Sequence, residues 1–231
     1  MFQFKQFTIH QENCAMKVTE IACLQGAYAP IETSAKTLLD IGSGTGLLSL
    51  MLAQRFSQIE IDAIEIDEQS FHQGQENIQA SPFSANINCL QADVTQYLFT
   101  KKYDFIVVNP PFFENQLKSS NASKNKAWHS TELTLEKLII IIKNNLAHHG
   151  SCSILLPIER KKDLDQLIAA NNLFLNQCLL IQPNEKLQIK YFIALISFHA
   201  NEPIFEELII KEKGVYTART NTLFKDFYLK L

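Results

Sequence analysis

The sequence lacks the features that mark membrane, exported and metal-binding proteins. No apolar run approaches the roughly 18 residues needed to cross a bilayer, and no basic stretch with an apolar signal core follows Met1. The five cysteines are odd in number and form no Cys-x-x-Cys pair, and neither they nor the six histidines show metal-ligand spacing. We therefore expect a cytoplasmic protein with reduced thiols, no membrane partner and no metal.

The sequence also has no internal repeat, no low-complexity tract and no strong excess of one charge. Its 231 residues are 46% apolar and include 16 phenylalanines, which is enough for a sizeable buried core. The formal net charge of -3 neither requires nor excludes a nucleic-acid partner, because a local basic face is sufficient for one. Composition alone thus indicates a folded domain and leaves its function open.

Apolar runs of strand character alternate with helical patterns along most of the chain. Helical patterns cover residues 15–29, 47–56, 68–80, 135–146 and 163–171, and Gly150 suits the C′ position after the fourth of them. The strand-like runs are 37–41, 59–66, 87–92, 103–108, 153–157, 191–199 and 205–210. This alternation predicts an α/β fold with three layers, a mostly parallel sheet and right-handed crossovers.

A glycine-rich loop, LLDIGSGTG from Leu38 to Gly46, follows the first of these strands and opens a helix. Gly42, Gly44 and Gly46 let the backbone come close to a ligand at the strand end, although an ordinary βα turn also uses glycine. The spacing is GxGxG, whereas dinucleotide sites carry GxGxxG, and Asp40 would oppose a pyrophosphate. The loop therefore argues against a nicotinamide oxidoreductase and favours a cationic ligand.

Acidic residues stand at the ends of the next two strands. Glu65 lies 19 residues beyond Gly46, where a carboxylate accepts ribose hydroxyls, and Asp93 in QADV is placed to accept from an exocyclic amine. Each acid alone has an ordinary interpretation as a solvated carboxylate. Together with Asp40 they line the edge at which open sheets bind ligands, and they predict a cationic adenosine, S-adenosylmethionine.

The apolar run that ends at Val108 is followed by Asn109, Pro110, Pro111 and Phe112. The prolines cannot continue a sheet and stiffen the turn. A stiff turn fixes the Asn109 side-chain oxygen and the Pro110 carbonyl as two acceptors beside the flat Phe112 ring. We expect this corner to hold a planar –NH₂ group and to catalyse methyl transfer to its nitrogen by positioning and electrostatics, with Asn109 also next to the cofactor.

These stretches resemble the motifs of class I methyltransferases. LLDIGSGTG looks like their first motif, IDAIEID their second, QADV their third and NPPF their fourth, and the resemblance covers most of residues 35–160. It implies a Rossmann-like sandwich with a seven-stranded, mostly parallel sheet. The fourth motif resembles that of enzymes acting on adenine N6, guanine N2 or protein glutamine N5.

The two ends of the chain resemble the bacterial family that methylates adenine N6 in valine tRNA, next to the anticodon. The stretches are FKQFTIHQENCAMKV, LQGAYAP and VYTARTNTLFKDFYL. One departure is that the family's Gly-Thr-Asp-Gly turn is replaced by Thr19, Glu20, Ile21 and Ala22. The resemblance implies an S-adenosylmethionine-dependent tRNA methyltransferase, monomeric, with one domain over 1–231 made of a cap segment (1–34) and a catalytic core (35–231).

Three alternatives follow from the same motifs. Methylation of guanine N2 in ribosomal RNA is compatible with NPPF. The enzymes for protein glutamine usually carry a further N-terminal domain, for which about 35 residues leave no room. A non-catalytic RNA-binding relative is disfavoured because the glycines and Asn109 are retained.

An RNA substrate needs cationic contacts to phosphate. The polar loop at 114–130 leaves directly from the Asn109 corner and carries Lys118, Lys124, Lys126 and Trp128. We expect the lysines to contact phosphates, and Trp128 either to stack on a base beside the adenine or to anchor the start of the next helix in the core. The adenine itself must leave its stack to reach Asn109.

Overall fold

The computed structural model describes residues 1–14, 16–110 and 133–230. Its helices are α1 (Glu20–Tyr28), α2 (Leu47–Arg55), α3 (Glu68–Gln79), α5 (Leu135–Asn145), α6 (Lys161–Ala170) and α7 (Ala218–Phe224), with short 3-10 turns η1 (Ser84–Asn86) and η2 (Ile158–Arg160). Its strands are β1 (Phe2–Gln3), β2 (Thr8–Ile9), β3 (Thr37–Ile41), β4 (Glu60–Glu65), β5 (Ile87–Gln91), β6 (Tyr103–Val108), β7 (Leu146–Pro157), β8 (Phe174–Asn184), β9 (Tyr191–Ser197), β10 (Ile204–Glu212) and β11 (Val215–Tyr216).

One large sheet runs through the molecule in the order β11-β10-β8-β9-β7-β6-β3-β4-β5. The pairs β6–β7, β3–β6, β3–β4, β4–β5 and β8–β10 are parallel. Strand β9 is antiparallel to both of its neighbours, and β11 is antiparallel to β10. The sheet is therefore mostly parallel, and the carboxyl ends of β3, β4, β5, β6 and β7 meet at one edge.

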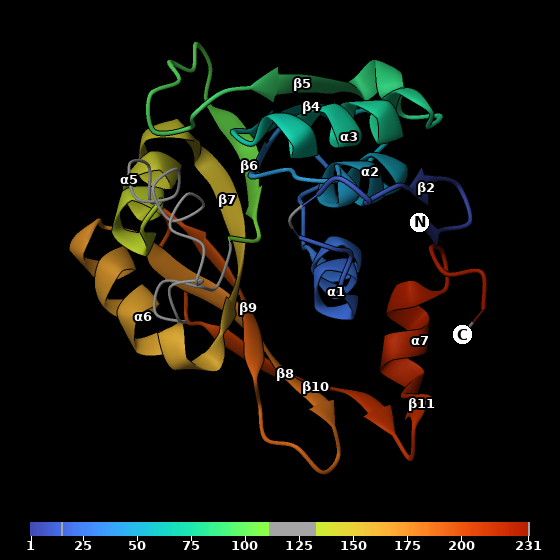
Figure 1. The fold of residues 1–231 in the computed structure, drawn as a ribbon. Helices are drawn as coiled ribbons and strands as arrows, with labels where there is room; N and C mark the ends of the chain where they lie inside the picture. Colours follow the sequence, from blue (N-terminus) through green and yellow to red (C-terminus); the bar gives the residue numbers. More distant parts are fainter. Residues whose placement is uncertain (15, 111–132, 231) are drawn as a thin grey trace, which may run out of the picture.

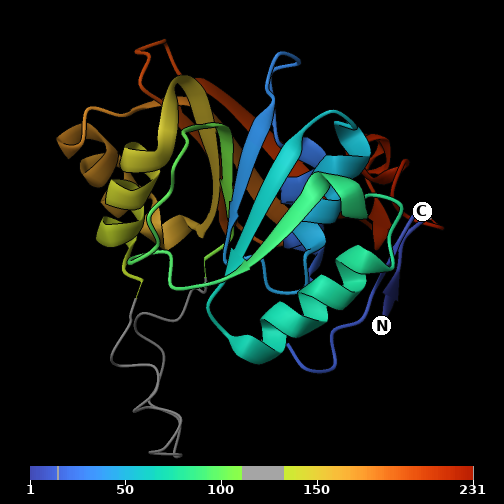
Figure 2. The ribbon, with the colours of Figure 1, turned by 90° about the horizontal axis from the view of Figure 1, so that it is seen from above.

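Helices cover both faces of this sheet, as Figures 1 and 2 show. Helices α1, α2 and α7 and the Ile78 turn of α3 pack into one core with the side chains of one sheet face. Helices α5 and α6 pack into a second core on the opposite face. The central strand β6 serves both, since Phe105 and Val107 belong to the first core and Ile106 and Val108 to the second. This explains its nearly unbroken apolar sequence, in which Asp104 is the one polar residue, and confirms the predicted three-layer fold.

The two ends of the chain meet beside α1. Strands β1 and β2 pair as a small antiparallel hairpin, and Phe4 forms an isolated bridge with Tyr228. The ring of Phe4 stacks on Phe7 at 4.6 Å, and that of Tyr228 stacks on Phe224 at 4.4 Å. The aromatic residues near both termini thus form one cluster, which holds the N-terminal segment against the C-terminal helix.

The predicted number of seven strands was too low, because the large sheet contains nine among the described residues. All seven strand-like runs of the sequence are strands of this sheet. The two that the sequence did not indicate are β8 and β11. Strand β8 carries the polar residues Asn176, Gln177 and Gln182 and has a register shift between Leu175 and Gln177, so its pattern does not alternate. The two-residue β11 exists only through its pairing with β10.

Gly150 was wrongly assigned to a helix C-terminus. Helix α5 ends at Asn145, and Gly150 lies inside strand β7, opposite a register shift in β6. A Cβ atom at this position would lie 2.8 Å from the carbonyl oxygens of Tyr103 and Asp104. Glycine is therefore required by close approach of two backbones and not by a helix cap.

The first predicted helix was also too long, because α1 begins at Glu20 and the residues described before it are not helical.

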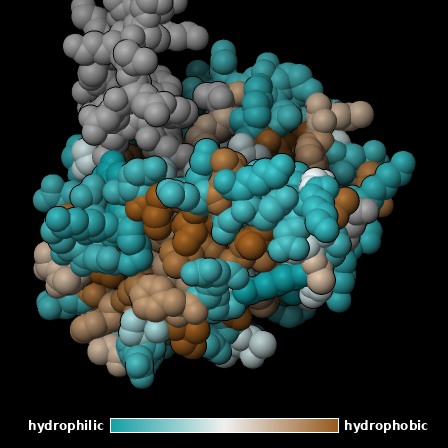
Figure 3. Space-filling model, turned by 90° about the horizontal axis from the view of Figure 1, so that it is seen from below, coloured by the Kyte–Doolittle hydropathy of each residue, from teal (hydrophilic) through white to brown (hydrophobic). Residues whose placement is uncertain are grey.

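The outer strands are less covered than the central ones. Seen from below, apolar side chains gather on the surface between polar margins (Figure 3). Exposed apolar residues at the β10 side of the sheet include Ile204, Phe205 and Val215, which have 61%, 56% and 68% of their surface accessible. Across the described part of the chain, none of the helices has the length and apolar character of a membrane span.

Candidate active site

The predicted cofactor residues come together at the carboxyl edge of the central strands. Asp40 lies in β3, directly ahead of the glycine loop, and Glu65 is the last residue of β4. Asp93 follows β5 by two residues, and Asn109 directly follows β6. Because these four strands are neighbours and parallel, the four side chains belong to adjacent positions along one edge.

The glycine loop has a left-handed backbone that suits glycine. Gly42, Gly44 and Gly46 have φ angles of 71°, 50° and 78°. A Cβ atom on Gly42 would meet nothing within 4 Å, so this side of the loop faces open space. Substitution there would be strained by the backbone, and it would also place a side chain where a ligand can approach.

The loop uses its own amides inside the protein. The N–H groups of Gly42 and Ser43 donate to the Ile64 carbonyl at 2.9 and 3.1 Å. The Gly46 N–H donates to the Ser43 carbonyl at 2.8 Å, and the Gly44 N–H donates to Glu65 Oε2 at 2.9 Å. With these four amides already paired, the loop is poorly suited to cradle a pyrophosphate, which agrees with the GxGxG spacing.

Glu65 is a buried carboxylate at the centre of this arrangement. Its Oε2 accepts from Gly44 and its Oε1 accepts from the Asp67 N–H at 2.9 Å. Burial raises the pKa of Glu65, although the backbone hydrogen bonds act in the opposite direction. The carboxylate is therefore held in a fixed orientation, and each oxygen keeps a lone pair for a further donor.

Asp40 is almost fully buried beneath the loop. Its Oδ2 accepts from the Ser49 hydroxyl at 2.6 Å and from the Ser49 N–H at 3.1 Å, while its Oδ1 is buried without a hydrogen-bond partner among the described residues. Burial, and to a smaller extent the charge of Glu65, raise the pKa of Asp40 to about 7, despite the opposing bonds from Ser49. Asp40 thus orients the start of α2 and retains one free acceptor.

Asp93 organises the turn after β5. Its Oδ1 accepts from the Thr95 N–H at 2.8 Å and hydroxyl at 2.7 Å, and its Oδ2 accepts from Gln96 Nε2 at 2.9 Å. Partial burial works against ionisation, but these hydrogen bonds outweigh it and lower the pKa of Asp93. The side chain is charged and fixed, and it is more exposed than Asp40 or Glu65.

Asn109 carries an unpaired acceptor at the end of β6. Its Oδ1 is buried and has no hydrogen-bond partner in the described part of the chain. Pro110 is buried beside it. Leaving a buried acceptor unpaired costs about 1–3 kcal/mol, and at this edge of the sheet the atom is available to a donor group of a ligand. The other predicted residues of this region, Pro111, Phe112, Lys118, Lys124, Lys126 and Trp128, lie outside the described residues.

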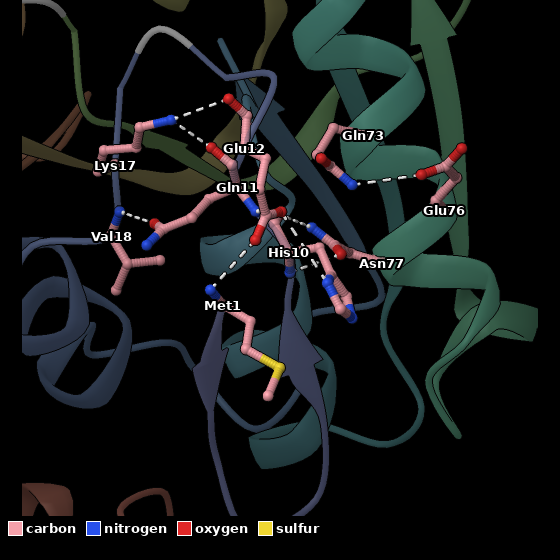
Figure 4. A network of polar contacts seen from close by, with 9 residues as sticks. All are labelled: Met1, His10, Gln11, Glu12, Lys17, Val18, Gln73, Glu76 and Asn77. Carbon is pink, nitrogen blue, oxygen red and sulfur yellow. Dashed lines mark hydrogen bonds and ion pairs between the residues drawn. The ribbon is translucent and has the colours of Figure 1, made fainter.

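Asn77 is a site residue that the sequence did not indicate (Figure 4). Its Nδ2 donates to the Thr45 carbonyl of the glycine loop at 2.9 Å and to the His10 carbonyl at 2.8 Å. Its Oδ1 accepts from the His10 N–H at 2.9 Å. One buried amide of α3 therefore joins the glycine loop to the N-terminal segment. The available signal was an asparagine beside Ile78 on the buried face of an amphipathic helix.

The N-terminal segment after His10 is held in its fold by hydrogen bonds between its own residues (Figure 4). Gln11 Oε1 accepts from the Val18 N–H at 2.7 Å, and Lys17 Nζ donates to the Gln11 and Glu12 carbonyls. The buried thiol of Cys14 lies within hydrogen-bonding reach of Ser70, at the start of α3, where burial raises its pKa. This segment thus lies against the start of α3.

The departure at Thr19 and Glu20 has a clear structural outcome. Thr19 is the N-cap of α1 and accepts from the Ala22 N–H at 3.2 Å. Glu20 Oε1 accepts from Tyr216 Oη and pairs with Lys211 Nζ, both at 2.7 Å. Glu20 therefore fastens α1 to β10 and β11, and its carboxylate is engaged away from the glycine loop.

Gln25 is a second residue that the sequence did not indicate. It is fully buried in α1, and its Nε2 donates to the Val108 carbonyl at 3.0 Å. The same nitrogen lies 3.3 Å from both Ser153 O and Ser153 Oγ in β7. Gln25 thus reaches the end of the strand that carries Asn109.

Solved structures share this fold. A crystal structure described as a predicted O-methyltransferase from Agrobacterium tumefaciens aligns with a TM-score of 0.70 at 16% identity, over 90% of this chain and 96% of that one. A ribosomal protein L11 methylase from Lactobacillus delbrueckii subsp. bulgaricus aligns with a TM-score of 0.57 at 16% identity, over 82% and 83% of the two chains. At this identity the likeness concerns the fold, and it confirms the expected class I methyltransferase architecture.

Sequence comparison extends over the full chain. The model of the methyltransferase small domain family matches residues 27–154. A tRNA1(Val) (adenine(37)-N6)-methyltransferase from Dyadobacter fermentans is 40% identical over 236 residues, which cover 99% of this chain and 97% of the relative. The protein of the same name from Cytophaga hutchinsonii is 38% identical over 236 residues, covering 100% and 98%. The chain therefore belongs to the tRNA1(Val) (adenine(37)-N6)-methyltransferase family.

Proposed function

We propose that this chain transfers a methyl group from S-adenosylmethionine to N6 of adenine 37 in tRNA1(Val). The full-length relatives named for this reaction support the substrate, and they favour adenine over guanine N2 or glutamine N5. The observation that carries the chemistry is the buried Oδ1 of Asn109 at the carboxyl end of β6, which has no hydrogen-bond partner among the residues that the structure describes.

The residues at the sheet edge fit the cofactor. Gly42 offers open space for close approach, and the free Oδ1 of Asp40 suits a cationic group. Glu65 is buried and oriented at the position where a carboxylate accepts ribose hydroxyls, and the charged Asp93 is placed to accept from an exocyclic amine. We assign cofactor binding to these residues together with Gly44, Gly46 and Asn109.

The corner after β6 acts by positioning. S-adenosylmethionine, when bound, supplies an electrophilic methyl group on a sulfonium. The Asn109 Oδ1 and the Pro110 carbonyl accept the two N–H bonds of the adenine amine, which hold its nitrogen in place and favour a more pyramidal geometry. Phe112 is assigned to stack on the adenine ring, and Pro111 to stiffen the turn. No strong base is required, since the methylated nitrogen sheds its proton readily after transfer.

Recognition of the tRNA is assigned to the loop that follows. Lys118, Lys124 and Lys126 supply cations for phosphates, and Trp128 supplies a ring for a neighbouring base. We propose that the chain acts in the cytoplasm as a monomer and as a single catalytic domain, in which residues 1–34 cap the core.

The test is transfer of a labelled methyl group to purified tRNA1(Val) transcripts. Label is expected in N6-methyladenosine at position 37, and a transcript with guanine at position 37 should receive none. Total tRNA and ribosomal RNA from cells lacking this activity, followed by nucleoside mapping, provide the comparison of substrates. Label in N2-methylguanosine, or none in any RNA, would overturn the proposed function.

A further inference from the structure

Gln25 is an amide placed inside an apolar helix. Helix α1 buries Gln25 completely, and its neighbours on the helix, Leu24 and Cys23, belong to the first core. The Nε2 of Gln25 has three acceptors, which are Val108 O at 3.0 Å and Ser153 O and Oγ at 3.3 Å. All three belong to the strands β6 and β7 and none to α1 itself. The side chain therefore links the N-terminal helix to the catalytic end of the sheet.

The hydrogen bond to Val108 acts on the peptide group that leads into the site. The Val108 carbonyl and the Asn109 N–H form one rigid plane. Val108 is the last residue of β6 and pairs with Ile41 of β3 and Ile154 of β7, whereas Asn109 lies beyond the strand. A donor on the Val108 oxygen fixes the plane and, through it, the direction in which the Asn109 side chain leaves the backbone.

Stability alone does not account for Gln25. The Oε1 of Gln25 is buried and has no hydrogen-bond partner among the described residues, which is an energetic cost that an apolar residue would avoid. The glutamine amide therefore carries an energetic cost that leucine at this position would not have. What the amide adds is the N–H donor that it directs at the Val108 carbonyl. Gln54 in α2 offers a comparison, because its Nε2 donates to Asp226 O at 2.8 Å and its Oε1 is likewise buried and unpartnered.

We propose that Gln25 is a positioning residue for methyl transfer, acting through the Val108 carbonyl to aim Asn109. This inference rests on the proposed function. It assigns to the N-terminal helix an indirect part in catalysis, in addition to its part in closing the molecule. Gln25 does not touch the cofactor residues, so its loss should alter the rate of transfer and leave cofactor affinity in place.

The experiment compares Gln25→Met with Gln54→Met in the full chain. Methionine keeps the length of the side chain and removes the amide. For each variant we would measure the thermal midpoint, the S-adenosylmethionine dissociation constant by calorimetry, and the single-turnover rate with tRNA1(Val) at saturating concentrations. Gln25→Met should reduce the rate about tenfold or more with a dissociation constant within about twofold of wild type, while Gln54→Met should leave both unchanged.

A second readout does not depend on turnover. A hydrogen bond to a carbonyl shifts the ¹⁵N resonance of the amide in the same peptide group, so Gln25→Met should move the Asn109 backbone resonance and Gln54→Met should not. Gln25→Asn, which keeps an amide but is one methylene too short, should behave like Gln25→Met and replaces it if that variant does not fold. Ser153→Ala should keep the rate within about threefold, because Val108 retains its donor.

The outcomes separate the two proposals. If the wild-type chain transfers methyl groups and Gln25→Met does so at the same rate, the role of Gln25 alone would be overturned. An Asn109 resonance that does not move in Gln25→Met would have the same consequence. A loss with Ser153→Ala as large as that with Gln25→Met would show that the contact to β7 is what matters, and would overturn it too. Absence of transfer by the wild-type chain would overturn the proposed function and this inference with it.

Discussion

The backbone N–H of Gly44 donates to Glu65 Oε2 at 2.9 Å, so the glycine loop after β3 and the last residue of β4 form one unit. Glu65 also accepts from the Asp67 N–H, at the start of α3. Two βα connections at the sheet edge, after β3 and after β4, are therefore fixed by a single carboxylate. Glu65 therefore sets the shape of the loop, in addition to the role of ribose acceptor that we propose for it.

Replacing Glu65 should weaken cofactor binding. Glu65→Ala removes the proposed ribose acceptor and frees the Gly44 amide, and loss of a hydrogen bond to a charged group corresponds to roughly a 10–100-fold change in affinity. Calorimetric titration with S-adenosylmethionine measures this change. Glu60→Ala, an exposed acid at the other end of the same strand, should leave the dissociation constant unaltered. Equal affinities for the Glu65 variant and wild type would remove Glu65 from the cofactor site.

Replacing Asn109 should separate binding from catalysis. Asn109→Ala removes the Oδ1 acceptor, and loss of one preorganised electrostatic contact typically lowers the rate by about 100–1,000-fold. In the proposed assignment the cofactor rests mainly on the loop and on the acids of β3 to β5, so its dissociation constant should change by less than about threefold. The single-turnover rate of transfer to tRNA1(Val) tests the expected loss of catalysis, and calorimetry tests the expected retention of cofactor affinity. Near-wild-type turnover would refute the assigned role.

Much of this edge was predictable because its signals are local. The acids and Asn109 directly follow or end apolar runs, and parallel strands bring their carboxyl ends to one edge whatever the rest of the fold does. The three glycines of the loop were singled out from their spacing alone, and in the structure Gly42, Gly44 and Gly46 all adopt positive φ angles. Residue order along the chain was enough for these positions.

The features that were missed depend on partners far away in the chain. Asn77 contacts His10, 67 residues away, and Gln25 contacts Val108, 83 residues away. Gly150 is a glycine because the backbone of β6 comes close at Asp104. The residues next to Asn77, Gln25 or Gly150 in the sequence do not reveal which distant segment each of them contacts. Strand β8 was missed for a different reason, since its polar residues interrupt the alternation that marks a strand.

Replacing Asn77 should loosen the glycine loop and the N-terminal segment together. Asn77→Ala leaves the His10 N–H and the carbonyls of His10 and Thr45 without their partner, and we expect the free energy of unfolding to fall by about 2–3 kcal/mol. The affinity for S-adenosylmethionine should fall as well, because Thr45 lies within the loop. Asn86→Ala, which removes amide bonds to Ser57 and Ile59 far from the loop, is the matched control for urea unfolding and calorimetry. A variant that lost stability but kept full affinity would contradict the coupling.

Gly74 offers a test in which helix propensity and packing disagree. It lies inside α3, where alanine is favoured over glycine by about 1 kcal/mol. However, a Cβ atom at Gly74 would lie 2.4 Å from the Gly44 carbonyl oxygen, which is backbone and cannot move aside without displacing the loop. We expect Gly74→Ala to lower the free energy of unfolding by about 1–3 kcal/mol and to weaken cofactor binding. Gln79→Ala, on the exposed face of the same helix, should do neither, and a stabilised Gly74 variant would show that the loop yields freely.

Asp40 should make the stability of the cofactor-free protein depend on pH. Burial raises its pKa to about 7 in the folded state, whereas the unfolded chain has the ordinary value of 3.8. Between these values the folded state binds the additional proton, so stability falls as pH rises and the loss is complete above the folded-state pKa. Relative to Asp40→Asn, the wild-type free energy of unfolding should therefore decrease by about 2–3 kcal/mol from pH 5 to pH 7. Urea unfolding of both proteins across this range measures the difference, and a difference that does not vary with pH would mean that Asp40 is ionised in the folded state throughout.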